Sequence, residues 1–145
     1  MTLPVLVPSV EDASRLAKLG EVGSRLAERF WPGPLTIVCR RGEASLGWDL
    51  GGDPATIGVR MPGLPDALDV LGRAGPLAVT SANRSGEPTP STCEEVRAIF
   101  GDMVAYYLCD HLPLEGRPST VIDVSGAEAR ILREGVLGAD EVLGA

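Results

Sequence analysis

Four short apolar runs, each ending in arginine, serine or threonine, constrain the fold of this chain more than any other feature. They lie at 57–62, 77–88, 117–123 and 129–135. A short apolar run bounded by turn residues is typical of a buried strand. Because open α/β sheets bind ligands at the ends of their strands, the polar residues predict an anion site, best suited to a phosphate chain.

The richest of these ends follows the predicted buried strand at 77–79. Its loop carries Thr80, Ser81, Asn83, Arg84 and Ser85 within a few residues of one another. Such hydroxyl and amide groups also hydrogen-bond their own backbone in tight turns, so this loop alone leaves a turn and an anion site equally open. The other three strand ends favour the anion site.

Strand and helix signals alternate along the chain. The pattern predicts strands at 4–7, 35–40, 56–60, 77–79, 102–109, 119–124 and 129–133, and helices at 10–29, 65–72, 92–100 and 139–143. Ser9 caps the first helix, Gly20 and Gly23 are points where it can split, and Ser91 opens a capping box. Several links between strands are too short for a crossover helix. We therefore predict one α/β domain over 1–145, with a mixed sheet and flanking helices.

Composition narrows the function. The chain has 145 residues and a net charge of −7, which argues against broad non-specific nucleic-acid binding. Only Lys18 among the 13 basic residues is a lysine, and the planar fork of arginine suits carboxylate and phosphate. His111, the single histidine, is more typical of a solvated loop than of a hydrolase triad, and Ser81 lacks the Gly-x-Ser-x-Gly elbow. Neither a Walker nor a dinucleotide-binding motif occurs.

The three cysteines have no metal-type spacing. Cys39 alternates with apolar neighbours and Cys109 follows an apolar run, so we interpret both as buried thiols. The pattern fits a reducing, cytoplasmic compartment. No leader and no apolar run of membrane-spanning length is present, so no membrane partner is expected.

Several blocks of the sequence resemble those of a known family. The blocks lie at 30–36 (Phe-Trp-Pro-Gly-Pro-Leu-Thr), 59–62, 79–88, 118–121 and 131–135 (Ile-Leu-Arg-Glu-Gly). They resemble successive blocks of the YrdC-type threonylcarbamoyl-AMP synthases, in the order of that family, over nearly all of the chain. The resemblance implies an α/β fold with a twisted sheet around a deep cavity.

The resemblance also implies a reaction. L-Threonine, bicarbonate and ATP give threonylcarbamoyl-adenylate and pyrophosphate, and the carbamoyl group later reaches adenosine 37 of tRNA through partner proteins. ATP would be a substrate and would bring Mg²⁺ with it, because acidic residues of this chain show no ligand-like clustering.

Site residues follow from the matching blocks and from the donors at the strand ends. Ser81, Asn83 and Ser119 match family positions that contact ATP phosphates, and Arg133 matches an arginine near the nucleotide. Arg60 matches the arginine of a Val-Arg-x-Pro block, at either the threonine or the phosphate end. Thr120 is a further donor for ATP, and Thr36 and Ser85 are weaker candidates. No catalytic residue is assigned.

The chain departs from the family at its beginning. Family members open with a Pro-Thr-Asp/Glu-Thr-Val-Tyr-Gly-Leu block and a Lys-x-Arg block, whereas this sequence starts at the segment that follows them. Three hypotheses stay open: an active synthase, a module that binds nucleotide or RNA without chemistry, and a fragment of a longer protein. A fragment would expose a sheet edge, which predicts dimerisation or aggregation.

Overall fold

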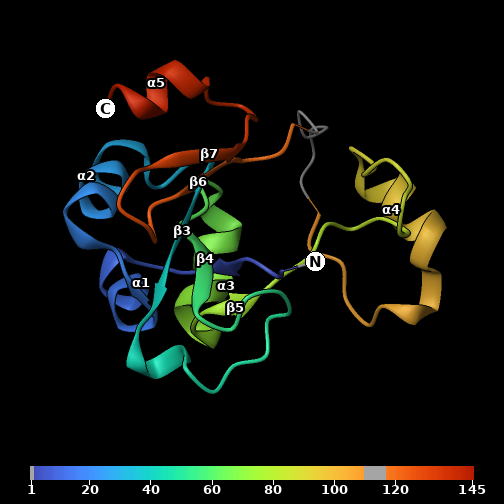
Figure 1. Ribbon diagram of the computed structural model, residues 1–145. Coiled ribbons are helices and arrows are strands. Elements are labelled where there is room, and N and C mark those ends of the chain that lie inside the picture. The colour runs from blue at the N-terminus through green and yellow to red at the C-terminus, as the bar shows by residue number, and fades with distance from the viewer. Residues whose placement is uncertain (1, 110–116) are drawn as a thin grey trace. The chain divides into compact units, whose positions relative to one another are not determined.

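A computed structural model describes residues 2–109 and 117–145 (Figure 1). The described chain forms two compact units, the first built from residues up to Val79 together with Pro118–Ala145, and the second from Thr80–Arg117. The first unit contains the sheet and the second contains α4 (Cys93–Phe100). The predicted α/β class, with a mixed sheet and flanking helices, is confirmed.

The sheet of the first unit has seven strands in the order β5-β1-β4-β3-β6-β7, with β2 pairing beside β3. The strands are β1 (Val5–Leu6), β2 (Ala17–Lys18), β3 (Leu35–Arg41), β4 (Thr56–Arg60), β5 (Leu77–Ala78), β6 (Thr120–Asp123) and β7 (Arg130–Arg133). Two of the pairings, β1 with β4 and β3 with β6, are parallel, and the other four are antiparallel. The central strand β3 therefore joins the two parallel parts of the sheet.

The helices of the first unit are α1 (Val10–Leu16), α2 (Gly20–Phe30), α3 (Pro65–Ala74) and α5 (Ala139–Leu143), with a short 3₁₀ turn at Glu43–Ser45. Ser9 caps α1 by accepting a hydrogen bond from the backbone N–H of Asp12. The predicted helix over 10–29 is split into α1 and α2, and Gly20 at the break has a φ of +67°. The first helix already ends at Leu16, because Ala17 is extended and begins the short strand β2, and Gly20 allows the turn from which α2 starts.

The core lies on one face of the sheet. Leu35, Ile37 and Cys39 alternate along β3 and are fully buried, as is the similar pair Ile57 and Val59 on β4. Buried residues of α1, α2 and α5 belong to the same cluster. Figure 1 shows α1 and α2, drawn in blue, on one side of the strands. Because side chains alternate across a strand, the intervening residues of β3, β4, β6 and β7 lie on the opposite side, which we call the open face.

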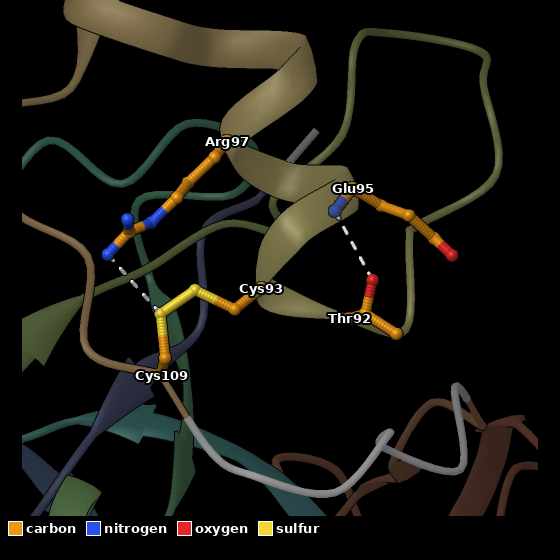
Figure 2. The surroundings of a disulfide bond; sticks show 5 residues. All are labelled: Thr92, Cys93, Glu95, Arg97 and Cys109. Atoms are coloured by element: carbon orange, nitrogen blue, oxygen red, sulfur yellow. Dashed lines mark hydrogen bonds between the residues drawn. A yellow bond between two sulfur atoms is a disulfide. The ribbon is translucent and has the colours of Figure 1, made fainter.

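The second unit contains α4 and a 3₁₀ turn at Gly101–Met103. The N-cap of α4 is Thr92, whose hydroxyl accepts from the backbone N–H of Glu95 (Figure 2). The expected capping box begins at Ser91, one residue too early. Thr92 and Glu95 have the same Ser/Thr-x-x-Glu spacing in a register shifted by one residue, and the hydroxyl cap of that motif is formed.

Two strand predictions are wrong in part. Residues 104–109 form no strand, because a strand needs a ladder partner and the described part of the second unit has no strand to supply one. Leu77 is 39% exposed rather than buried. Its strand β5 pairs only with β1 at the end of the sheet, and an edge strand keeps one side open to solvent.

The interpretation of Cys109 as a buried thiol is also wrong. Cys109 is exposed and forms a disulfide with Cys93, their Cα atoms lying 5.5 Å apart (Figure 2). A guanidinium nitrogen of Arg97 lies 3.9 Å from the Sγ of Cys109. The apolar run before Cys109 suggested burial, but that run lies on the surface of the second unit. Cys39, in contrast, is a fully buried free thiol as predicted.

Candidate functional site

The open face of the sheet forms the floor of a cavity of about 510 Å³. All residues that line it belong to the first unit: Thr2, Leu3, Pro4, Thr36, Val38, Asp53, Thr56, Gly58, Ser119, Val121, Asp123, Ser125, Arg130, Leu132 and Arg133. Polar side chains lie at the two ends of β6, with Val121 between them. The cavity thus offers a small molecule two different polar ends.

One end carries Arg133 and the two hydroxyls nearest to it. Arg133 donates from Nε and Nη2 to the carbonyl oxygen of Ser119, at 3.1 and 2.8 Å, and from Nη2 to Ser119 Oγ at 3.2 Å. The hydroxyls of Ser119 and Thr36 lie 2.8 Å apart, and both residues are less than a tenth exposed. These contacts fix the guanidinium beside two hydroxyl groups that face the cavity.

Arg60 is not among the residues that line the cavity, but it adds a second positive charge close to Arg133. It ends β4 and donates from Nε to the carbonyl oxygen of Gly33 at 3.0 Å. Burial, and then repulsion from Arg133, lower the pKa of Arg60 below its ordinary value. In the described chain neither arginine has a carboxylate partner among the three ion pairs. Two neighbouring cations without a counter-charge favour binding of an anion.

Thr120 is a predicted donor that lies away from the cavity. It is fully buried, and its hydroxyl donates to the carbonyl oxygen of Leu137 at 2.6 Å. The hydroxyl oxygen of Thr120 also accepts hydrogen bonds from the backbone N–H groups of Gly135 and Leu137. This hydroxyl joins β6 to the segment that leads into α5. Its predicted contact with ATP stays a prediction, and its geometry favours a structural role.

Ser81, Asn83 and Ser85 belong to the second unit. Asn83 donates from Nδ2 to the carbonyl oxygens of Arg84 and Glu87, both at 2.9 Å, and its Oδ1 accepts from Thr89 at 3.2 Å. The amide is therefore engaged in the local turn. Ser81 and Ser85 are exposed. Contact of this loop with phosphate stays a prediction.

At the other end of the cavity the central group is Asp123, which was not among the predicted site residues. One carboxylate oxygen accepts from the N–H and the hydroxyl of Ser125, at 2.8 and 2.6 Å, and the other accepts from Arg130 at 3.3 Å. Burial alone would raise the pKa of Asp123, but the hydrogen bonds from Ser125 and Arg130 hold it below its ordinary value. The signal was an Asp-x-Ser turn directly after a strand, which sequence reasoning treats as turn chemistry.

Comparisons with known proteins agree with this architecture. A family model for Sua5, YciO and YrdC proteins, described as "Telomere recombination", matches residues 1–135. The chain belongs to the Sua5/YciO/YrdC family. Sua5 of Pyrococcus abyssi in complex with L-threonine superposes with a TM-score of 0.84 at 32% identity, covering 99% of this chain and 43% of that one. Escherichia coli YciO superposes with a TM-score of 0.78 at 25% identity, covering 98% and 69%.

Curated relatives in the Sua5/YciO/YrdC family carry an enzyme name. A Mycobacterium tuberculosis protein, provisionally named threonylcarbamoyl-AMP synthase, is 42% identical over 147 residues, which cover 99% of this chain and 63% of the relative. The threonylcarbamoyl-AMP synthase of P. abyssi is 35% identical over 142 residues, covering 97% and 42%. The chain thus spans less than two thirds of the length of these relatives.

The described residues also bear on metal binding, on His111 and on membrane insertion. Within 2–109 and 117–145, no three His, Cys, Asp or Glu side chains gather in a way that could hold a metal ion. His111 lies outside the described residues, so its predicted solvated position is not addressed. Among the described helices, none has the length and apolar character needed to cross a bilayer.

Proposed function

We propose that the chain makes threonylcarbamoyl-AMP from L-threonine, bicarbonate and ATP, with release of pyrophosphate. The observation that carries this proposal is the pair Arg60 and Arg133, two neighbouring cations that have no carboxylate partner among the described residues. Arg133 lies beside the hydroxyls of Ser119 and Thr36. The enzyme name of the curated relatives and the threonine complex of P. abyssi Sua5 support the choice of substrates.

The proposed chemistry asks for positioning and charge stabilisation. A carbamate oxygen of N-carboxythreonine attacks the α-phosphorus of ATP, the new P–O bond forms, and the bond to the pyrophosphate leaving group breaks. Negative charge builds on the phosphate oxygens during this step. Arg133 and Arg60 would stabilise that charge, and Ser119 and Thr36 would orient the oxygens, because donors that are already held in place need no rearrangement as the charge develops.

Magnesium enters the proposal only with ATP. The described acidic residues show no metal-binding cluster, and Mg²⁺ commonly keeps several waters and binds through substrate phosphates. The ion would neutralise phosphate charge when bound. No step here is assigned to it.

The product would pass to proteins that modify adenosine 37 of tRNA, in the cytoplasm. A net charge of −7 favours such a transfer between proteins over direct contact of this chain with RNA. The sheet path ends at β5 and β7, and an edge strand can pair with another chain. A homodimer through either edge stays a prediction.

Calorimetry and pyrophosphate release test the proposal together. We expect the 145-residue chain to bind ATP with Mg²⁺ and to release pyrophosphate only when L-threonine and bicarbonate are both present. Arg133→Gln should weaken ATP binding by about 1.5–3 kcal/mol, the value of a hydrogen bond to a charged group. Arg25→Gln, a charge-matched change on the exposed surface of α2, should leave it unchanged.

The outcomes separate the hypotheses left open by the sequence. ATP binding without pyrophosphate release would contradict the synthase and favour a binding module. A folded chain that binds no ATP would reject both. Equal weakening by the Arg133 and Arg25 variants would show that net charge, rather than the cavity, attracts the nucleotide.

A further inference from the structure

The cavity has a shape and polarity that distinguish its two ends. Ser119 lies just before β6 and Asp123 ends it, four residues farther along. At about 3.3 Å of rise per residue, the two ends are roughly 13 Å apart. Donors occupy the Ser119 end, and a carboxylate acceptor occupies the Asp123 end. A nucleotide is long enough to bridge this distance, from its phosphate to the far edge of its base.

An apolar strip crosses the sheet beside the Asp123 end. Val38 of β3 pairs with Asp123, and Gly58 of β4 pairs with Val38. Val121 lies between Ser119 and Asp123 on β6, and Leu132 lines the cavity from the neighbouring strand β7. Gly58 has no side chain to rise from the floor, and Leu132 is 55% exposed on β7. A flat aromatic ring lying on this strip would remove the apolar surface of Leu132 from water, which is favourable.

The acceptor at the far end is held in one orientation. Asp123 Oδ1 accepts two hydrogen bonds from Ser125, and Oδ2 has only the 3.3 Å contact with Arg130. A carboxylate oxygen can accept two hydrogen bonds, so Oδ2 keeps capacity for a ligand donor. The Asp123 side chain is 14% exposed, and the residue lines the cavity. A ligand that places an N–H group there would be favoured over one that places a carbonyl oxygen there.

We propose that Asp123 is a base-specificity residue, which accepts a hydrogen bond from the exocyclic amino group of adenine. This inference rests on the proposed function, because it assumes that the phosphates lie at the Ser119 and Arg133 end of the cavity. The ligand that this site favours is therefore a purine nucleotide with an amino group at position 6. A purine with a carbonyl oxygen there, as in inosine or guanine, would meet the carboxylate oxygen with like partial charge.

The test compares ATP with ITP, which differs at that position by having oxygen in place of the amino group. We expect the wild-type chain to bind ATP about tenfold or more tightly than ITP, since a site that hydrogen-bonds a substrate group discriminates against the analogue without it. Equal affinity for ATP and ITP would overturn the inference without any variant. No binding of either would instead overturn the proposed function.

Asp123→Asn sharpens the test because its two terminal atoms differ. The two donors of Ser125 hold the amide oxygen, so the NH₂ group takes the place of Oδ2 and turns an acceptor into a donor. We expect the ratio of ATP to ITP affinity to fall to one or to reverse. Binding of inorganic triphosphate, which has no base, should not change.

The matched control is Asp53→Asn, which removes the same charge from the other carboxylate that lines the cavity. Asp53 accepts from the backbone N–H of Ala55 in an exposed loop. We expect it to keep the wild-type preference for ATP. An equal loss of preference in both variants would overturn the assignment to Asp123. The same holds if Asp123→Asn weakens L-threonine binding and leaves the nucleotide ratio intact, since Asp123 would then serve the amino acid.

Discussion

The hydroxyl oxygens of Thr36 and Ser119 lie 2.8 Å apart although 83 positions separate the two residues in the sequence. Parallel pairing of β3 with β6 brings them together, because Leu35 pairs with Thr120 and Thr36 with Val121. The contact between the two hydroxyls therefore belongs both to the pairing of β3 with β6 and to the lining of the cavity.

Replacing Thr36 by valine separates these two roles. Valine keeps the shape of the side chain and removes the hydroxyl, so we expect a loss of stability of about 1 kcal/mol, as for one hydrogen bond. We expect ATP binding to weaken by more than this because Ser119 loses the neighbour that orients it. Denaturant unfolding and calorimetry measure the two effects. A change in stability with unaltered ATP affinity would exclude Thr36 from the site.

Gly135 is a position where any side chain would displace the site. A Cβ there would overlap the carbonyl oxygen of Pro118 and lie 2.6 Å from the carbonyl carbon of Ser119. Gly135→Ala should therefore destabilise the fold by about 1–3 kcal/mol, the range for overpacking, and should weaken ATP binding. Gly138→Ala is the control, since nothing lies within 4 Å of its Cβ position. Equal unfolding midpoints for the two variants would contradict the close contact.

The three cysteines should differ in reactivity. In the oxidised native chain we expect no alkylation, because Cys93 and Cys109 form a disulfide and Cys39 is fully buried. Mild reduction should expose two reactive thiols, and denaturation should add the third. Mass spectrometry counts the modified sites. Alkylation of Cys39 in the native chain would show that the core opens readily.

Alkaline pH should weaken the fold through Cys39. Burial, together with the negative charge of Asp123, raises the pKa of this thiol from 9.0 to about 12. As the pH rises, the unfolded chain therefore loses the thiol proton before the folded chain does. The contribution of the protonated thiol to the free energy of unfolding is complete below pH 9 and declines between pH 9 and 12. Urea unfolding across this range measures the slope. Cys39→Ala should have a shallower slope, and an unchanged slope would assign the effect to other groups.

Much of the first unit follows from local sequence signals. The strands at Thr56–Arg60 and Arg130–Arg133 and the terminal helix Ala139–Leu143 lie where apolar runs and turn residues predict them. Local patterns were insufficient where long-range pairing decides the outcome. Residues 104–109 have strand propensity but no partner, and β5 is at an edge that the sequence does not reveal.

The candidate site was only half accessible to sequence reasoning. Arg60, Ser119 and Arg133 were predicted as donors at strand ends, and the structure places them near one another in the first unit. Their roles stay predictions. Asp123 was missed because its importance depends on the open face, which appears only when β3, β4, β6 and β7 are aligned. Thr120 was favoured by its motif, but strand alternation turns it toward the core.

The order of synthesis adds a consequence of the β3 and β6 pairing. β4 leaves the ribosome roughly sixty residues before β6, and β3 leaves earlier still. A nascent chain therefore carries a half-finished sheet with one side of β3 unpaired along Leu35–Val38. Contacts between segments so distant in sequence form slowly. The end of the cavity formed by Thr36 and Ser119 is therefore one of the last parts of the molecule to be assembled, and the proposed nucleotide site is complete only after β6 joins the sheet.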